Sequence, residues 1–255
     1  AGQRIAFAVV QQILEVAVNA DDAADDVDGV AGVWRRVDDF KASVRFVAEP
    51  DRQPQGVLAS LVGDVGARFM AFDALRSGKI TLDTKFPVSE KAWRMQGSKM
   101  FVELGTSIAV QDLIRGIIIQ SGNDAAIVMA EGLGGTEQDF VDQMNAKMKS
   151  LGMNNTHFAD ASGWPEPDHY STAHDLVTLA THLIRDYPED YKYFSEKEFT
   201  WHNIHQMNRN PLLFRDVGAD GLKTGHAEEA GAGYGLMGSG IRDGRRSLMV
   251  LNGME

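Results

Sequence analysis

The sequence contains no cysteine among its 255 residues. That absence excludes disulfide bonds, catalysis by a thiolate and zinc sites built from cysteine ligands. The seven histidines remain as candidate metal ligands, and His202 and His205 are three residues apart. They fall in a predicted strand and turn, where this spacing does not direct two side chains toward one ion. We therefore expect no metal site.

Positive charge and long apolar runs are also scarce. The 25 lysines and arginines are outnumbered by 36 aspartates and glutamates, which leaves a formal net charge of −11. A nucleic-acid partner is not expected, because phosphate binding requires a basic surface. No apolar run reaches the roughly 18 residues that a membrane-spanning helix needs. With 44% apolar and 24% charged residues, the chain has the composition of a globular protein with a sizeable core.

Helical signals dominate the middle of the chain. Apolar residues recur at helical spacing after Val110, and a break at Ser121-Gly122 separates that helix from the next. Thr136 with Asp139 resembles a capping box, and the same device returns in a later helix that Pro188 stops. The predicted helices cover residues 110–119, 123–133, 136–152 and 172–187.

Strand signals dominate the last third of the chain. Asp243-Gly244 is a favourable two-residue hairpin turn between two alternating apolar segments. Because helices come first and antiparallel strands late, the order predicts an α+β protein. The predicted strands cover residues 44–47, 198–204, 234–239 and 248–252.

Two polar motifs stand out against this background. Ser121-Gly-Asn123 lies at the junction of two predicted helices, and Lys223-Thr-Gly225 is followed by His226. Ser-x-x-Lys, Ser-Asp-Asn and Lys-Thr-Gly together form the signature of β-lactamases and penicillin-binding proteins. Each triplet alone is a weak signal, because short polar triplets also serve as helix caps and turns. Their order along one chain strengthens it.

The residue types in these motifs suit acyl transfer. The reaction needs a serine nucleophile, a base for its proton, donors for the oxyanion and a cation for a substrate carboxylate. A Lys-Thr-Gly on an edge strand offers a charge, a hydroxyl and a backbone that a substrate can approach closely. A Ser-x-Asn between helices offers a hydroxyl that passes protons and an amide that holds the substrate.

Longer stretches carry a specific resemblance. Residues 112–126, 153–158, 170–173 and the run Gly221-Leu-Lys-Thr-Gly-His226 resemble low-molecular-mass penicillin-binding proteins, the serine D-Ala-D-Ala carboxypeptidases. The similarity covers roughly residues 72–254. It implies the penicillin-recognising fold, an antiparallel sheet flanked by helices, in a single catalytic domain over 1–255. A helical subdomain at about 85–190 is expected within it, and the family's C-terminal β domain and membrane anchor are not expected in this sequence.

The resemblance also implies a role for each matching residue. It suggests four catalytic residues and four substrate-binding residues, and no metal or organic cofactor. For Ser60, His226 and Arg209 an ordinary structural role, respectively as a helix cap, a strand surface residue and a salt-bridge residue, stays open beside the functional one. The expected catalytic residues are Ser60, Ser121, Asn123 and Lys223, and the expected substrate-binding residues are Thr224, Gly225, His226 and Arg209.

One part of the signature is missing. No serine or threonine is followed by lysine three positions later, and the nearest remnant is Ser60-Leu-Val-Gly63, with glycine where lysine should stand. Two explanations are open: a degenerate protein that lost its catalytic base, or a slip of the reading frame upstream of residue 70.

The functional expectation follows from the resemblance. It is a serine-type D-Ala-D-Ala carboxypeptidase that trims peptidoglycan stem peptides through an acyl-enzyme and is acylated by β-lactams. Two alternatives stay open: a β-lactamase, for which Glu166 between two prolines is the candidate deacylating residue, and a non-catalytic peptidoglycan-binding relic. The expected location is periplasmic or exported, with membrane contact only through a segment missing from this sequence.

Overall fold

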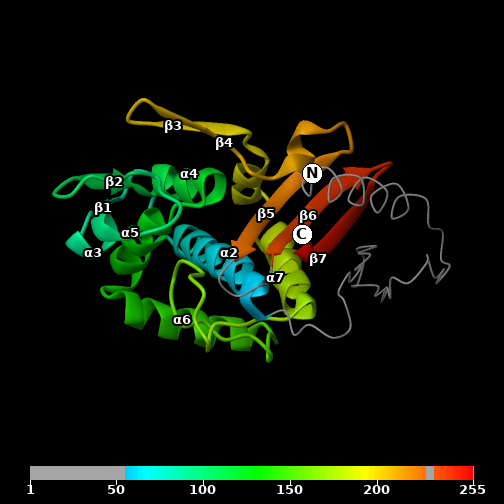
Figure 1. The fold of residues 1–255 in the computed structure, drawn as a ribbon, viewed down its shortest axis with the longest axis horizontal. Helices are drawn as coiled ribbons and strands as arrows, with labels where there is room; N and C mark the ends of the chain where they lie inside the picture. The colour runs from blue at the N-terminus through cyan, green and yellow to red at the C-terminus, as the bar shows by residue number, and fades with distance from the viewer. Residues whose placement is uncertain (1–54, 228–232, 255) are drawn as a thin grey trace.

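The computed structural model describes residues 55–227 and 233–254. Helices and antiparallel sheets make up this part of the chain, which confirms the α+β prediction (Figure 1). The strand predicted at 44–47 lies outside the described residues. No helix of the described ranges is both long and apolar enough to cross a bilayer.

A three-stranded antiparallel sheet forms one layer of the molecule. Its order is β5 (Ala219–Ala227), β6 (Gly233–Arg242) and β7 (Arg245–Met254), so β5 is an edge strand within the described residues. Asp243 and Gly244 join β6 to β7 with φ angles of 50° and 74°. Positive φ at both positions is the requirement of a type I′ turn, which confirms the predicted hairpin.

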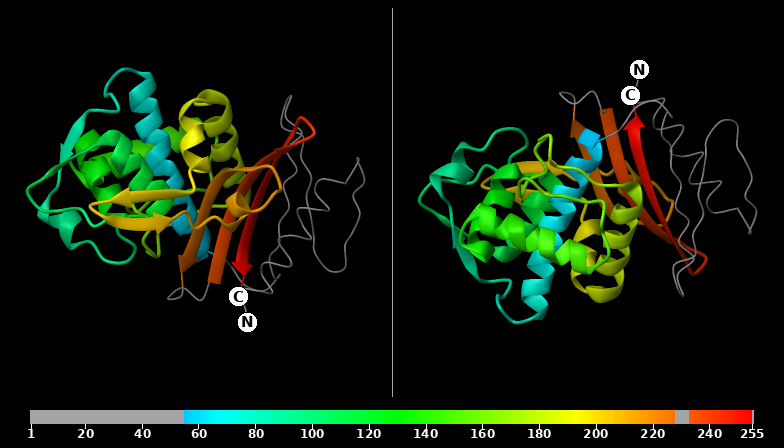
Figure 2. Two further views of the ribbon diagram at one scale, coloured as in Figure 1. Left: turned by 90° about the horizontal axis from the view of Figure 1, so that it is seen from above. Right: turned by 90° about the horizontal axis from the view of Figure 1, so that it is seen from below.

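Two helices cover one face of this sheet. Figure 2 shows α2 (Gln55–Arg76) and α7 (Ala173–Asp186) on the same side of β5–β7. α2 contacts β5 and β6, and α7 contacts β7. α2 also touches the helices beyond it, so Leu61, Phe69 and Phe72 are almost completely buried. The sequence of α2 is apolar on most sides because the helix is enclosed on most sides.

The middle helices agree with prediction. They are α4 (Val110–Gln120), α5 (Asn123–Gly134) and α6 (Glu137–Ser150). The Thr136 hydroxyl accepts a hydrogen bond from the Asp139 backbone N–H at 3.1 Å, and Thr172 does the same for Asp175 at 3.2 Å. Both threonines therefore act as N-caps, as the capping patterns indicated.

The prediction of one strand over 198–204 was wrong. The segment turns at His202 and Asn203, with φ angles of 44° and 66°, and forms a hairpin of β3 (Glu198–Trp201) and β4 (Ile204–Met207). Asn and His tolerate the left-handed region better than most residues, so a two-residue turn fits here. The sequence patterns did not predict three other short elements, which are β1 (Lys85–Pro87), α3 (Glu90–Arg94) and β2 (Ser107–Ala109).

Asp124 ties the segment between α3 and β2 to the start of α5. Its carboxylate accepts backbone N–H bonds from Met100 at 2.8 Å, Phe101 at 2.8 Å and Val102 at 3.1 Å. Asp124 is 1% exposed, and Phe101 has a φ of 68°. A buried carboxylate that accepts several amides is a strong local constraint, and it fixes the neighbourhood of Asn123.

Replacing Asp124 with Asn should lower the free energy of unfolding by about 1.5–3 kcal/mol, the range for hydrogen bonds to a charged group. The new amide NH2 would face backbone donors that now meet an oxygen. Denaturant titration measures the effect. Asp142→Asn is the control, because Asp142 is exposed and accepts from Gln138 on the helix surface. Equal stability of the two variants would contradict the assigned role.

Candidate active site

The junction between α4 and α5 presents two of the expected residues, Ser121 and Asn123, and we call the region around these two residues the corner. Ser121 ends α4 in the left-handed conformation, with φ 52° and ψ 39°. That conformation costs a residue with a Cβ roughly 1–2 kcal/mol. Asn123 begins α5, and its Nδ2 donates to the Gln96 carbonyl at 3.0 Å. The strained backbone at Ser121 is the kind of outlier that occurs at functional sites.

Lys223 on the edge strand β5 reaches this corner. Its side chain is 3% exposed, and Nζ donates to Ser121 Oγ and, at 2.7 Å, to the Thr224 carbonyl. Nζ also lies 2.7 Å from Asp64 Oδ2. An ammonium group has three donors, and these three oxygens can accept all of them. The expected residues Ser121 and Lys223 are thus in direct contact.

Burial changes the protonation of Lys223. Desolvation lowers the pKa of the ammonium and the Asp64 carboxylate opposes that effect, with a net pKa of about 8. Near neutral pH a small fraction of the amine is therefore unprotonated. A group with a pKa near the working pH is suited to transfer protons.

Asp64 is a site residue that the sequence analysis missed. It lies on α2 with its side chain 7% exposed, and besides Lys223 it accepts from Ser121 Oγ at 3.4 Å. Arg68 Nη2, one helical turn later, is 3.8 Å from the same oxygen Oδ2. A signal was present in the sequence: an aspartate and an arginine four residues apart interrupt an otherwise apolar helix.

Cations outnumber carboxylates in this corner. Arg68 is fully buried, donates to the Ile117 carbonyl at 3.0 Å and lies over the Phe194 ring, and burial lowers its pKa to about 10. Arg68 and Lys223 are both buried and share the Asp64 carboxylate, and the exposed Arg209 lies nearby. An excess of buried positive charge favours the binding of an anion, such as a carboxylate.

Arg209 and Asn123 are both attached to the segment before Met100. Arg209 Nη1 donates to Ser98 Oγ at 2.7 Å, two residues from the Gln96 carbonyl that Asn123 contacts. The residue as a whole is exposed, yet partial burial lowers the pKa of its guanidinium, and attraction to Asp64 opposes the shift. Arg209 therefore lies near the corner, and no hydrogen bond or ion pair among the described residues joins it to Ser121 or Lys223.

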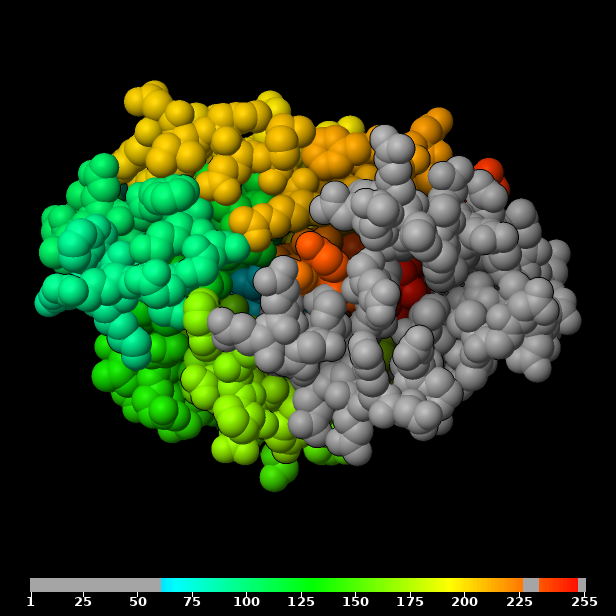
Figure 3. All heavy atoms as spheres, in the orientation of Figure 1, coloured from blue at the N-terminus to red at the C-terminus, as the bar shows by residue number. Residues whose placement is uncertain are grey.

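The remaining expected residues follow Lys223 along β5. Thr224 is partly exposed, Gly225 is buried opposite Gly235, and His226 is exposed. The His226 ring stacks on Tyr234 of the neighbouring strand, with centroids 4.1 Å apart. Figure 3 shows a recess in which part of α2 is visible between β5 and the segments near residues 100 and 165.

Ser60 and Gly63 both lie on α2. Ser60 precedes Asp64 by one turn and so belongs to the same helix face; its side chain lies outside the described part of the structure. A Cβ at Gly63 would be 2.4 Å from the Cα of Gly163 and 3.2 Å from His169 Cε1. Position 63, where the sequence analysis placed the missing lysine, therefore faces the loop around Gly163, and the α2 residue that reaches Ser121 is Asp64.

No group of three or more His, Asp or Glu side chains converges as a metal site within 55–227 and 233–254. The corner itself presents a hydroxyl, an amine, a carboxylate and an amide. These are the groups that acyl transfer to a serine uses.

Replacing Gly63 with Ala should lower the free energy of unfolding by about 1–3 kcal/mol, the usual cost of overpacking. The new methyl group would meet backbone atoms of Gly163, which have no rotamer with which to yield. Chemical denaturation measures the change. Wild-type stability in this variant would mean that helix and loop are further apart than described.

Comparisons with known proteins identify the family to which the chain belongs. The model of the family described as D-alanyl-D-alanine carboxypeptidase matches residues 41–254. D-alanyl-D-alanine carboxypeptidase DacA of Haemophilus influenzae is 41% identical over 180 residues, which cover 69% of this chain and 45% of that protein. DacC of Escherichia coli is 38% identical over 221 residues, which cover 84% and 54% respectively. The chain spans about half the length of these relatives.

Solved structures give the same result. Penicillin binding protein 5 from Haemophilus influenzae superimposes with a TM-score of 0.75 and 37% identity over 81% of this chain and 60% of that one. The carboxypeptidase DacD from Francisella tularensis gives 0.76 and 31% over 92% and 70%. The expected penicillin-recognising fold is thereby confirmed. On sequence and structure together, the chain belongs to the D-alanyl-D-alanine carboxypeptidase family.

Proposed function

We propose that this chain is the catalytic domain of a serine-type D-Ala-D-Ala carboxypeptidase, which removes the terminal D-alanine from peptidoglycan stem peptides. The observation that carries the proposal is the contact of Lys223 Nζ with Ser121 Oγ beside the edge strand β5. The family match and the surplus of positive charge around Asp64 support it. A substrate ending in a carboxylate complements that charge.

The proposed reaction passes through an acyl-enzyme. The Ser60 hydroxyl attacks the carbonyl carbon of the penultimate D-alanine, and the C–N bond to the last D-alanine breaks. The hydroxyl proton passes through Ser121 toward the leaving amine, with Lys223 as the titratable partner. Water then hydrolyses the ester, which frees the shortened peptide and restores the Ser60 hydroxyl. Asn123 holds a substrate amide, and Arg209 and Thr224 receive the terminal carboxylate.

The presence of Asp64 beside Ser121 and Lys223 lowers the turnover rate that we expect. A carboxylate contacts Ser121 and Lys223 from α2, and it holds Lys223 in its charged form. Loss of a dedicated base from a serine enzyme typically costs on the order of 10⁴-fold in turnover. The reaction of this chain is therefore slow, and strained β-lactam rings are its most reactive substrates.

The proposed partners are stem peptides ending in D-Ala-D-Ala and β-lactam antibiotics. Cell-wall peptides of this kind lie outside the cytoplasmic membrane, so the proposed location is periplasmic or exported.

A fluorescent penicillin tests the proposed nucleophile. We expect covalent labelling on a denaturing gel, with a rate about 10⁴-fold below that of an enzyme with the complete motif. Ser60→Ala should abolish the label, while Ser150→Ala, a change at the exposed end of α6, should retain it. Label that persists in Ser60→Ala would show that another residue is acylated.

One alternative has structural support. Asp64 stands at the α2 position that contacts Ser121, which favours a relic that binds stem peptides without cleaving them. Peptide binding without D-alanine release would establish that alternative. Rapid hydrolysis of a chromogenic cephalosporin would instead indicate a β-lactamase.

The pH dependence of peptide affinity tests the role of Lys223. The terminal carboxylate, which Arg209 and Thr224 receive, is also attracted by the ammonium charge of Lys223, whose pKa is about 8. Above that pH the charge is lost, so affinity should fall by up to about tenfold per pH unit. Isothermal titration from pH 7 to 10 measures the slope.

The slope should disappear in Lys223→Met and persist in Lys192→Met, because Lys192 is an exposed lysine paired with Glu189 on the surface. A flat profile in the wild type, or an unchanged slope in Lys223→Met, would rule out this role for Lys223.

A further inference from the structure

A closed loop lies between α6 and α7. Its neck is an isolated antiparallel bridge, in which the His157 N–H donates to the Tyr170 carbonyl at 2.9 Å and the Tyr170 N–H donates back at 3.0 Å. Asn145 of α6 fixes the next residue, Phe158, through both its backbone N–H and its carbonyl, each at 2.9 Å. The twelve-residue path beyond the neck is therefore anchored where it leaves the helices.

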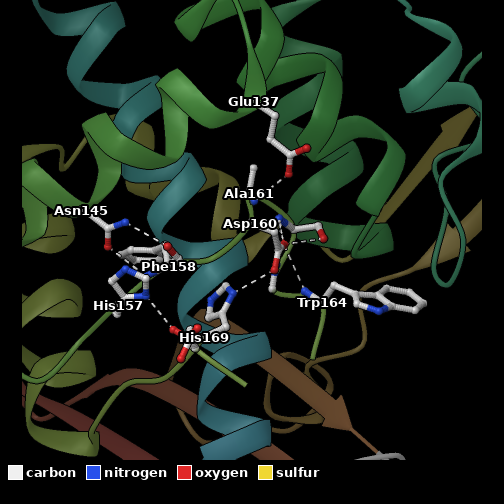
Figure 4. Close-up of polar contacts among 11 residues, drawn as sticks. Glu137, Asn145, His157, Phe158, Asp160, Ala161, Trp164 and His169 are labelled. Carbon is white, nitrogen blue, oxygen red and sulfur yellow. Dashed lines mark hydrogen bonds and ion pairs between the residues drawn. The ribbon is translucent and has the colours of Figure 1, made fainter. Parts of the chain in front are cut away.

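The interior of this loop is organised around one carboxylate oxygen. Asp160 Oδ1 accepts the backbone N–H groups of Ser162 at 2.6 Å, Gly163 at 2.7 Å and Trp164 at 3.2 Å, as Figure 4 shows. Successive amides that converge on one anion form a nest. Gly163 has a φ of 77°, which such a turn requires and which glycine adopts without strain. We call residues 160–164 the Asp160 turn.

The other oxygen of Asp160 binds a buried histidine. Oδ2 lies 2.9 Å from His169 Nδ1, and the His169 side chain is 0% exposed. Burial raises the pKa of Asp160, but hydrogen bonds from His169 and Ser162 outweigh it and hold the pKa below its usual value. The carboxylate therefore only accepts, and His169 Nδ1 donates. His169 Nε2 has no partner among the described residues, because the ring packs against Phe158.

The Asp160 turn borders the active site on two sides. Gly163 lies against Gly63 of α2 so closely that no Cβ fits between them, one residue from Asp64. Trp164 is half-buried, and its indole lies with Asn123 Nδ2 against Gly97: a Cβ at Gly97 would be 2.9 Å from the indole and 2.7 Å from the amide. The turn thus places the Trp164 indole beside the Asn123 side-chain amide, which holds the substrate in the proposed mechanism.

We propose that Asp160 and His169 are positioning residues, which hold Trp164 against Asn123 so that the indole forms the substrate-facing wall of the proposed carboxypeptidase site. A buried polar contact is a poor source of stability, because the desolvation of its groups offsets the attraction between them. The directions of its hydrogen bonds do fix the local geometry. Asp160 Oδ1 sets the backbone of residues 162–164, and Oδ2 ties the turn to His169, which lies next to the neck. The substrate class is the stem peptide of the proposed function, on which this inference rests.

Isosteric variants separate this role from general stability. Asp160→Asn keeps an oxygen for the amides but loses the charge, and His169→Ala removes the donor to Oδ2. His169→Asn is the rescue variant, because its Nδ2 can donate from nearly the position of the histidine Nδ1. The matched controls are His182→Asn and Asp186→Asn, a histidine–aspartate pair of similar length, 2.8 Å, on α7.

Two readouts are needed. Amide hydrogen exchange at residues 162–164 should accelerate at least tenfold in Asp160→Asn and His169→Ala, and stay at the wild-type rate in both controls. Affinity for an acetylated tripeptide ending in D-Ala-D-Ala, followed by nuclear magnetic resonance, should weaken at least fivefold in the same two variants and in Trp164→Ala. His169→Asn should restore most of the wild-type protection from amide exchange and most of the wild-type peptide affinity.

The outcomes are distinct. Faster amide exchange at residues 162–164 with unchanged peptide affinity overturns the positioning role. Unchanged amide exchange shows that Asp160 and His169 do not hold the turn in place. If the wild type binds neither the tripeptide nor a penicillin, the proposed function fails. The inference is then decided by exchange and by the Trp164 indole N–H signal, which must shift in Asp160→Asn and His169→Ala but not in the controls.

Discussion

The buried ammonium group of Lys223 is the contact on which the site depends. With its side chain 3% exposed, it needs oxygen partners. They come from three places: Asp64 on α2, Ser121 at the α4–α5 junction and the adjacent carbonyl on β5. One charge therefore joins the central helix, the helical region and the edge of the sheet. The left-handed turn at Ser121 and the Asp124 anchor keep the second of these partners in place.

Much of the fold followed from local patterns in the sequence. The N-caps at Thr136 and Thr172 and the Asp243-Gly244 turn were predictable because each depends on a few adjacent residues. The β3–β4 hairpin was not, because its turn uses His202 and Asn203 in place of glycine. Short elements such as β1 and β2 have three residues each, too few for a periodic pattern.

The site was predictable in part. The sequence motifs indicated Ser121, Asn123 and Lys223, and the structure brings the first and last into contact. Asp64 stands out in the sequence as a charged residue in an apolar helix, but its role was missed because the partners that it meets are set by the packing of α2 against β5 and the α4–α5 junction. The Ser-x-x-Lys spacing counted from Ser60 placed the missing lysine at Gly63, which packs on the loop. Asp160 and His169 were missed because their contact forms only when the loop closes.

The left-handed Ser121 has a consequence for sequence drift. Its backbone conformation is one that glycine adopts without strain, so a Ser121→Gly change would relieve the local cost while deleting the hydroxyl that touches Lys223. A substitution that stabilises the fold at position 121 would therefore remove a group that acyl transfer uses.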